Sequence, residues 1–255
     1  MNPDREFDSS YNRVAVYCAS SRDVRPVFMD AAEELGRLLG SHGRDIVYGG
    51  GNIGLMGRLA DAAIEAGGNV IGVIPRFMMD LELGHKRISQ LKVVGDMHER
   101  QNAMIRGSDC VIALPGGCGT FMELLEAISW KKLGLILSPI IIVNIDNYYD
   151  PMVEMLDRAI DEKFMKADLR HLWRVAANAR EAADLVEEYL PKFEQIEKSR
   201  QNYFHLSINR PGAKSCRRWP TGYVRGRSAK SLARSTLRPR MPRSVNFLNL
   251  AISRR

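Results

Sequence analysis

Short, continuously apolar runs alternate along the chain with longer segments whose apolar residues recur at helical spacing. The apolar runs predict strands that are covered on both faces, at Arg13–Cys18, Asp45–Tyr48, Asn69–Ile74, Leu91–Val94, Cys110–Leu114, Ile140–Ile145 and Trp173–Ala176. Helices are expected at Pro26–Leu39, Gly54–Ala66, Met97–Ile105, Phe121–Leu133, Pro151–Glu162 and Glu181–Leu190. This strict alternation predicts an α/β fold with a doubly wound parallel sheet.

One segment, Arg76–Gln90, breaks the alternation. It follows Pro75 and contains Gly84 and several charged residues. We therefore expect a loop near the carboxyl ends of the strands, where open α/β sheets bind their ligands. The whole pattern fits a single Rossmann-like domain of residues 12–197, preceded by an extension of residues 1–11.

Charge divides the chain into two parts. Residues 1–197 carry 22 Lys/Arg and 30 Asp/Glu, whereas residues 198–255 carry 15 Lys/Arg and no acidic residue. The basic tail lacks hydrophobic periodicity and contains four prolines, so we expect it to be disordered. Three interpretations remain: a dispensable solvated extension, a nucleic-acid-binding segment whose aromatic residues lie among basic ones, or a frameshifted reading of the gene.

Other features narrow the class of protein. The longest apolar stretch, Leu133–Val143, is about half a membrane span, and the N-terminus MNPDREFD lacks the apolar core of a secretory signal. The four cysteines, Cys18, Cys110, Cys118 and Cys216, have neither CxxC nor CxxH spacing. Free thiols in a reducing cytoplasm, without contact to a membrane, are the expectation.

Two glycine-rich turns follow predicted strands and lead into predicted helices. They are GGGNIGLMG at Gly49–Gly57 and PGGCGT at Pro115–Thr120. The start of a helix offers unpaired N–H groups and a partial positive charge, and glycine lets an anion approach the backbone. A tight strand-to-helix connection would explain each turn alone, but two in one sheet favour a phosphorylated ligand.

The type of phosphate can be narrowed further. Gly49, Gly51 and Gly54 match G-x-G-x-x-G, but the next strand ends IGVIP without the acidic residue of a dinucleotide site. Neither turn ends in the Lys-Ser/Thr of a nucleoside-triphosphate loop. A monophosphate or a sugar phosphate fits better.

Charged residues follow both predicted helix starts. Thr120 and Glu123 have the spacing of a capping box, which would explain both; alternatively, Glu123 projects into the phosphate site and stabilises a developing cation on a sugar. Asp96 and Glu99 form a second possible capping box and place Arg100 at the second helical turn. Arg100 is either a solvated helix charge or a group that holds a phosphate or aligns Glu123. His98 is a candidate acid or base, but it has no visible partner and is interpreted as structural.

At these residues the sequence resembles the Lonely Guy family of cytokinin riboside 5′-monophosphate phosphoribohydrolases, also labelled lysine decarboxylase-like. The family motif PGGxGTxxE corresponds to Pro115–Glu123, the glycine run ending GLMG to Gly49–Gly57, and DMHxRK to Asp96–Gln101. An opening strand ending in CGSS resembles Cys18–Ser21. The likeness covers about residues 12–190.

The resemblance implies hydrolysis of the N-glycosidic bond of a nucleoside 5′-monophosphate, which releases a free base and ribose 5-phosphate. It assigns catalysis to Arg100 and Glu123, and it implies a homodimer. We expect the reaction to need neither a metal ion nor an organic cofactor. The implied substrate-binding residues are Ser21, Gly50, Gly51, Glu82, Gln101, Gly116, Gly117, Cys118, Gly119 and Thr120.

Departures from the family pattern affect the expected substrate. Gln101 replaces the usual lysine, Ala19 replaces a glycine, and Cys118 stands where tyrosine or valine is common. The resemblance supplies no lysine for the Schiff base that a decarboxylase of this label would need. The alternative function is a carrier that binds a phosphorylated nucleotide or cofactor on the same fold without chemistry.

Overall fold

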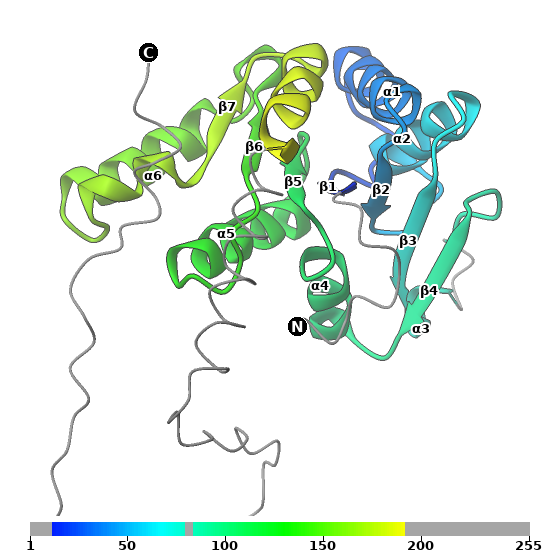
Figure 1. Ribbon diagram of the computed structural model, residues 1–255, viewed down its shortest axis with the longest axis horizontal. Coiled ribbons are helices and arrows are strands. Elements are labelled where there is room, and N and C mark those ends of the chain that lie inside the picture. Colours follow the sequence, from blue (N-terminus) through cyan, green and yellow to red (C-terminus); the bar gives the residue numbers. More distant parts are fainter. Residues whose placement is uncertain (1–11, 80–83, 192–255) are drawn as a thin grey trace, which may run out of the picture. The chain divides into compact units, whose positions relative to one another are not determined.

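The computed structural model describes residues 12–79 and 84–191. Its seven strands form one parallel sheet in the order β4-β3-β2-β1-β5-β6-β7 (Figure 1). The strands are β1 (Arg13–Tyr17), β2 (Asp45–Tyr48), β3 (Val70–Pro75), β4 (Gln90–Val94), β5 (Cys110–Ala113), β6 (Ile140–Val143) and β7 (Arg174–Ala176). From β1 the chain winds outward to β4, then returns to β5 on the other side of β1, which confirms the doubly wound topology.

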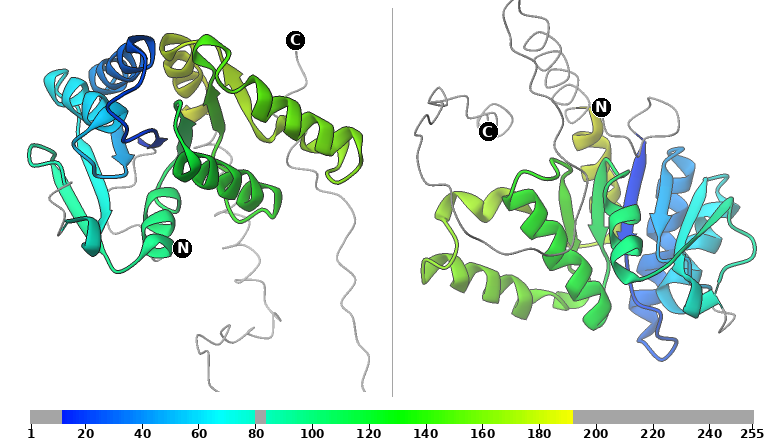
Figure 2. Two further views of the ribbon diagram at one scale, coloured as in Figure 1. Left: turned by 180° about the vertical axis from the view of Figure 1, so that it is seen from behind. Right: turned by 90° about the horizontal axis from the view of Figure 1, so that it is seen from below.

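Helices cover both faces of the sheet, which explains the continuous apolar strands. The helices are α1 (Pro26–Ser41), α2 (Gly54–Glu65), α3 (Arg76–Met79), α4 (Met97–Ile105), α5 (Cys118–Lys132), α6 (Asp150–Asp161), two 3₁₀ helices, η1 (Ile145–Asn147) and η2 (Ala167–Leu172), and a helix over residues 179–191. Figures 1 and 2 show α1 and α2 on one face and α4 and α5 on the other. No described helix is long and apolar enough to cross a membrane.

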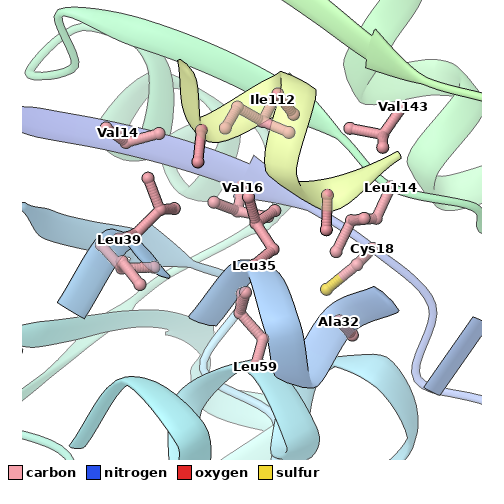
Figure 3. Close-up of a cluster of buried hydrophobic side chains, with 14 of the residues drawn as sticks. Val14, Val16, Cys18, Ala32, Leu35, Leu39, Leu59, Ile112, Leu114 and Val143 are labelled. Carbon is pink, nitrogen blue, oxygen red and sulfur yellow. The ribbon is translucent and has the colours of Figure 1, made fainter. Parts of the chain in front are cut away.

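The core consists of two hydrophobic layers that the central strands separate. Along β1, Val14 and Val16 pack toward α1 and α2, whereas Ala15 and Tyr17 face the layer beneath α4 and α5. Figure 3 shows the first layer, in which β1, β5 and β6 side chains meet Leu35 of α1 and others. This packing fixes the strands and, with them, the loops at their carboxyl ends.

Most predicted elements have observed bounds within one or two residues of the expected ones, and three differences affect the loops at the carboxyl ends of the strands. Helix α5 begins at Cys118 rather than Phe121, because glycines at a helix start hide its first turn from a propensity-based reading. Strand β6 ends at Val143, where the chain enters η1. The predicted loop Arg76–Gln90 contains the short helix α3, and β4 starts at its last residue.

The proposed division of the chain extends past the described residues. All described elements belong to the predicted domain of residues 12–197, whereas the extension of residues 1–11, the tail of residues 198–255, Cys216 and Glu82 lie outside them. Cys18 and Cys110 are buried free thiols, and Cys118 is an exposed one.

Candidate active site

The switch point of the sheet lies between β1 and β5, where the strand order reverses. Beyond these strands the two loops stay in contact, since the N–H of Ala19 donates to the carbonyl of Pro115 at 3.3 Å. The start of α2 joins them, because the N–H of Met56 donates to the carbonyl of Ala19 at 3.2 Å. A ligand site is expected in such a crevice.

A pocket of about 160 Å³ occupies this crevice. It brings together Ser21, from the loop after β1, and Gly116 and Gly117, from the turn after β5. These three were predicted to bind substrate. The lining residues are Ala19, Ser21, Val24, Phe28, Leu55, Pro115, Gly116, Gly117 and Tyr148.

The start of α5 opens at this pocket. Its N-cap is Gly117, which has no side chain to cap the helix, and the N–H groups of residues 117–120 form no hydrogen bond with any described residue. A Cβ at Gly117 or Gly119 would meet no atom of the described residues within 4 Å. Four unpaired N–H groups and the positive end of the helix dipole are the features by which a helix start can bind an anion.

The predicted capping box of Thr120 and Glu123 is wrong. Because α5 starts at Cys118, Thr120 is the third residue of the helix and Glu123 lies in the second turn. Thr120 instead packs over Gly116, where a Cβ would stand only 2.1 Å from the threonine Oγ1. Thr120 is 4% exposed, and within the described residues its hydroxyl has no hydrogen-bond partner. That hydroxyl is therefore free for a ligand at the helix start.

Arg100 and Glu123 form a buried ion pair one helical turn further along α5. Nη1 of Arg100 donates to Oε1 of Glu123, and the two side chains are 5% and 4% exposed. The second carboxylate oxygen accepts no hydrogen bond from a described residue. Neither side chain lines the pocket. The ion pair is a separate part of the site, and one turn of α5, from Thr120 to Glu123, links it to the helix start at the pocket.

The backbone of the sheet holds Arg100 in place. The last residue of β2, Tyr48, pairs with Gly72 of β3. The next carbonyl of β3, that of Val73, accepts a hydrogen bond from Arg100 Nε at 3.2 Å. Gly49 follows β2, and a Cβ there would lie 2.2 Å from Arg100 Nη2. The absence of a side chain at Gly49 thus makes room for the guanidinium group.

The electrostatics of the ion pair reflect its burial. Burial raises the pKa of the Glu123 carboxyl, and the charge and hydrogen bond of Arg100 oppose this rise. Burial also raises the pKa of the Tyr17 hydroxyl and of the Cys18 thiol, and the negative charge of Glu123 adds a smaller rise to both. Both groups therefore remain neutral beside the pair.

Helix α4 presents Arg100 through the cap that the sequence predicted. Asp96 is the N-cap residue and accepts from the N–H of Glu99 at 2.8 Å, while Glu99 reaches back to the N–H of Gly95 at 2.7 Å. Arg100 is buried, which excludes its interpretation as a solvated charge. The side chain of Gln101 is also buried and forms no hydrogen bond with a described residue. His98 is exposed.

The first glycine turn differs from the second because the protein itself uses its backbone. The carbonyl of Gly50 accepts from the N–H of His85, and the carbonyl of Gly51 accepts from the Tyr48 hydroxyl. Both glycines are buried and lie outside the pocket lining. Their assignment to substrate binding stays a prediction, as does that of Glu82, which lies outside the described residues.

Sequence reasoning missed the aromatic wall of the pocket. Phe28 belongs to α1, and Tyr148 follows β6 and the 3₁₀ helix η1. The available signal was position alone, because Tyr148 comes just after the carboxyl end of a predicted strand and therefore lies at the ligand-binding edge.

The fold and the site define a class: doubly wound α/β proteins with an open, glycine-rich helix start at the switch point and a buried carboxylate–arginine pair beside it. Residues 56–186 match the protein family described as "Possible lysine decarboxylase". The chain belongs to this family. The likeness reaches past residues 56–186, as similar curated proteins align over nearly three quarters of the chain.

These relatives are named for one activity. A cytokinin riboside 5′-monophosphate phosphoribohydrolase of Arabidopsis thaliana is 45% identical over 72% of this chain and 80% of its own. One of Oryza sativa subsp. japonica is 43% identical over 74% of this chain and 78% of its own. Among solved structures, the molybdenum-cofactor carrier protein of Chlamydomonas reinhardtii is 25% identical, with a TM-score of 0.56 over 72% of this chain and 99% of that one.

Proposed function

We propose that this protein hydrolyses the N-glycosidic bond of a cytokinin nucleoside 5′-monophosphate and releases the free base and ribose 5-phosphate. The observation that carries the proposal is the arrangement along α5, where an open helix start with free N–H groups is followed, one turn on, by the buried Glu123–Arg100 pair. The activity named for relatives that are 43% and 45% identical supports the same reaction.

In the proposed mechanism the start of α5 holds the phosphate. The backbone N–H groups of Gly117, Cys118, Gly119 and Thr120, together with the Thr120 hydroxyl and Ser21, bind the anion. A phosphate placed there directs the ribose along α5 toward Glu123. With the phosphate and the ribose held in this way, the base extends toward the loop that contains Glu82.

Glu123 stabilises the reaction at the sugar. As the bond between C1′ and the base stretches, the ionised carboxylate stabilises the positive charge that develops on the ribose and orients the attacking water. The water oxygen bonds to C1′, and its proton leaves with the base. Arg100 keeps the carboxylate in register through the hydrogen bond between Nη1 and Oε1.

A panel of nucleotides tests the proposal. The protein is incubated with adenosine 5′-monophosphate, its N6-prenylated analogue, a pyrimidine monophosphate and the matching nucleosides, and free base is measured by chromatography. We expect base release from a monophosphate and little from its nucleoside, because the helix start contributes only when phosphate is present. Equal hydrolysis of the nucleoside would contradict the phosphate-binding role of α5, and activity lost on dialysis against EDTA would contradict a metal-free reaction.

Two other functions predict different outcomes. A non-catalytic carrier would bind the monophosphate tightly without base release, but the buried carboxylate–arginine pair favours chemistry. A decarboxylase would need a Schiff-base lysine, and within the described residues neither the pocket lining nor the ion pair includes one.

We propose that the protein acts as a homodimer through the outward side of α5 and the turn after it. Four large apolar residues are exposed there: Met122, Leu125, Leu133 and Leu135. Helix α5 is therefore apolar on its outward side as well as on the side that faces the sheet, as expected of a helix that packs against protein on both sides. A second copy would bury this row in a symmetric interface.

Light scattering should give a dimer for the wild type and a monomer for Leu125→Glu, with the dimer retained in the control Met155→Glu on α6. A monomeric wild type would refute the proposal.

We propose that residues 12–197 form the catalytic domain in the cytoplasm and act without the basic tail. The acidic balance of this part and the location of the whole site within it support the division. A chain that ends at residue 197 should release base at the rate of the full chain. Binding of nucleic acid that disappears with the tail and falls steeply with salt would instead favour an electrostatic role for residues 198–255.

A further inference from the structure

Two successive tyrosines cover the carbonyl groups of the turn between β5 and α5. The Tyr148 hydroxyl donates to the carbonyl of Gly116 at 2.6 Å, and the Tyr149 hydroxyl donates to that of Leu114 at 2.8 Å. The two differ in exposure, since Tyr148 lines the pocket and is 37% exposed, whereas Tyr149 is buried. Only the first hydroxyl therefore works at the pocket wall.

A strained turn places these tyrosines. Asp146 and Asn147 have φ values of 51° and 60°, a left-handed conformation that few residues other than glycine adopt. The turn is held on both sides: Asp146 pairs with Arg25 of the α1 N-cap at 2.6 Å, and the Asn144 side chain accepts from the N–H of Tyr149 at 2.7 Å. Backbone strain of this kind persists where the surrounding structure enforces it.

Aromatic neighbours fix the ring of Tyr148. The ring of Phe28 from α1 meets it edge-on with centroids 5.6 Å apart, and the ring of Phe121 from α5 stacks on it at 6.4 Å. The hydroxyl is thereby aimed at Gly116 from a ring that has little freedom to turn away.

This geometry has an electrostatic consequence for the pocket. The start of α5 attracts an anion through its N–H groups, but the carbonyl oxygen of Gly116, in the same turn, carries partial negative charge. We infer that Tyr148 is a positioning residue that makes the pocket selective for a phosphorylated ligand. Its hydroxyl donates a hydrogen bond to the Gly116 carbonyl and so offsets the partial negative charge of that oxygen. The turn then presents N–H donors to the phosphate without an unpaired carbonyl oxygen beside them. The inference rests on the proposed function in one respect, the docking of phosphate at the start of α5.

The variant Tyr148→Phe tests this role, because it removes one oxygen and keeps the ring. We expect ribose 5-phosphate, measured by titration calorimetry, to bind roughly tenfold more weakly, because the Gly116 carbonyl is then left uncompensated beside the bound anion. In turnover of the nucleoside monophosphate, KM should rise by a similar factor while kcat changes less than about threefold. A residue that merely supported the fold would lower kcat and the melting temperature without this split.

Tyr149→Phe is the matched control, as the same chemical change on the same turn but outside the pocket lining. It should lower the melting temperature and leave the Kd for ribose 5-phosphate within about twofold. Unchanged binding by Tyr148→Phe, equal weakening by both variants, or no binding of ribose 5-phosphate to the wild type at millimolar concentration would each overturn the inference. A wild type that binds ribose 5-phosphate but releases no base would refute the proposed reaction and leave this inference standing.

Discussion

Arg100 and Glu123 form a buried ion pair although they belong to helices on either side of strand β5 in the sequence. Taking two charges out of water is expensive, and a pair of this kind is weak evidence for stability. It is better explained by chemistry, since Arg100 satisfies one oxygen of Glu123 and leaves the other without a partner among the described residues. In the proposed reaction, Glu123 stabilises the developing cation on the sugar and Arg100 keeps the carboxylate in place.

Glu123→Gln should abolish most turnover and preserve binding. The amide has nearly the shape of the carboxylate but no negative charge to stabilise the developing cation, so we expect kcat to fall by about 100-fold or more. The affinity for ribose 5-phosphate should change little, because the proposed phosphate site is at the start of α5, away from Glu123. Glu154→Gln, an exposed residue of α6, is the charge-matched control and should retain full activity. Near-wild-type kcat in Glu123→Gln would remove Glu123 from the mechanism.

Arg100→Met should destabilise the protein, because it leaves the Glu123 carboxylate buried without its partner. Loss of one member of a buried pair costs about 3–5 kcal/mol. The double variant Arg100→Met with Glu123→Gln should recover part of this loss, since the unpaired charge is gone. Urea unfolding of the wild type, both single variants and the double variant gives the coupling free energy. Strictly additive losses would show that the pair contributes nothing as a pair.

The fold was predictable from the sequence because its strongest signal is burial on both faces. Asp45–Tyr48 and Met97–Ile105 were predicted with the observed bounds, and the alternation of elements gave the correct sheet topology. The N-cap of α4 was predictable as well, because Asp96 is a strong capping residue at the expected position. Local chemistry decides such features, and a single sequence contains it.

Contacts between distant segments were not predictable in the same way. The sequence offered alignment of Glu123 as one of two roles for Arg100, but nothing in it indicated that Gly49 leaves space for the guanidinium group. The capping box at Thr120 failed because Gly116, Gly117 and Gly119 precede it and the helix starts earlier than propensity suggests. The role of Tyr148 depends on two left-handed residues in a turn, a conformation that the sequence IDNYYD permits but does not specify.

Gly49→Ala should reduce activity more than it reduces stability. The added Cβ would lie 2.2 Å from Arg100 Nη2 and 3.0 Å from Met56 Cε, so the guanidinium group must move away from its place over the turn. In the proposed mechanism kcat depends on the position of the carboxylate that Arg100 holds, so we expect a loss of about tenfold or more. The measurement is kcat together with the melting temperature.

Gly107→Ala is the control for this substitution, since among the described residues its Cβ would meet within 4 Å only Arg13 Nη1, at 3.3 Å, the end of a flexible side chain. It should keep wild-type kcat. Wild-type kcat in Gly49→Ala would mean that Arg100 adjusts without consequence, and that its position over Gly49 is unimportant for the reaction.

The pH dependence of turnover should carry the signature of a buried carboxyl group. Burial raises the pKa of Glu123 above its ordinary value of 4.5, so the ionised form exists only above the raised value. If that form stabilises the sugar cation, kcat at saturating substrate falls as the pH drops through the raised pKa, at a higher pH than for an exposed glutamate. The residual activity of Glu123→Gln should lack this limb. A limb that remains in Glu123→Gln would belong to another group, such as the substrate phosphate.

The same pKa shift has an opposite effect on stability, which provides an independent check. The folded state binds the Glu123 proton more tightly than the unfolded state, so the contribution of this group is fully present below about pH 4.5 and is lost as the pH rises through the raised pKa. The free energy of unfolding of the wild type, relative to Glu123→Gln, should therefore decrease with rising pH across that range. Denaturant unfolding at several pH values measures this difference. A difference that increases with pH would mean that Arg100 outweighs burial and that the pKa of Glu123 is lowered.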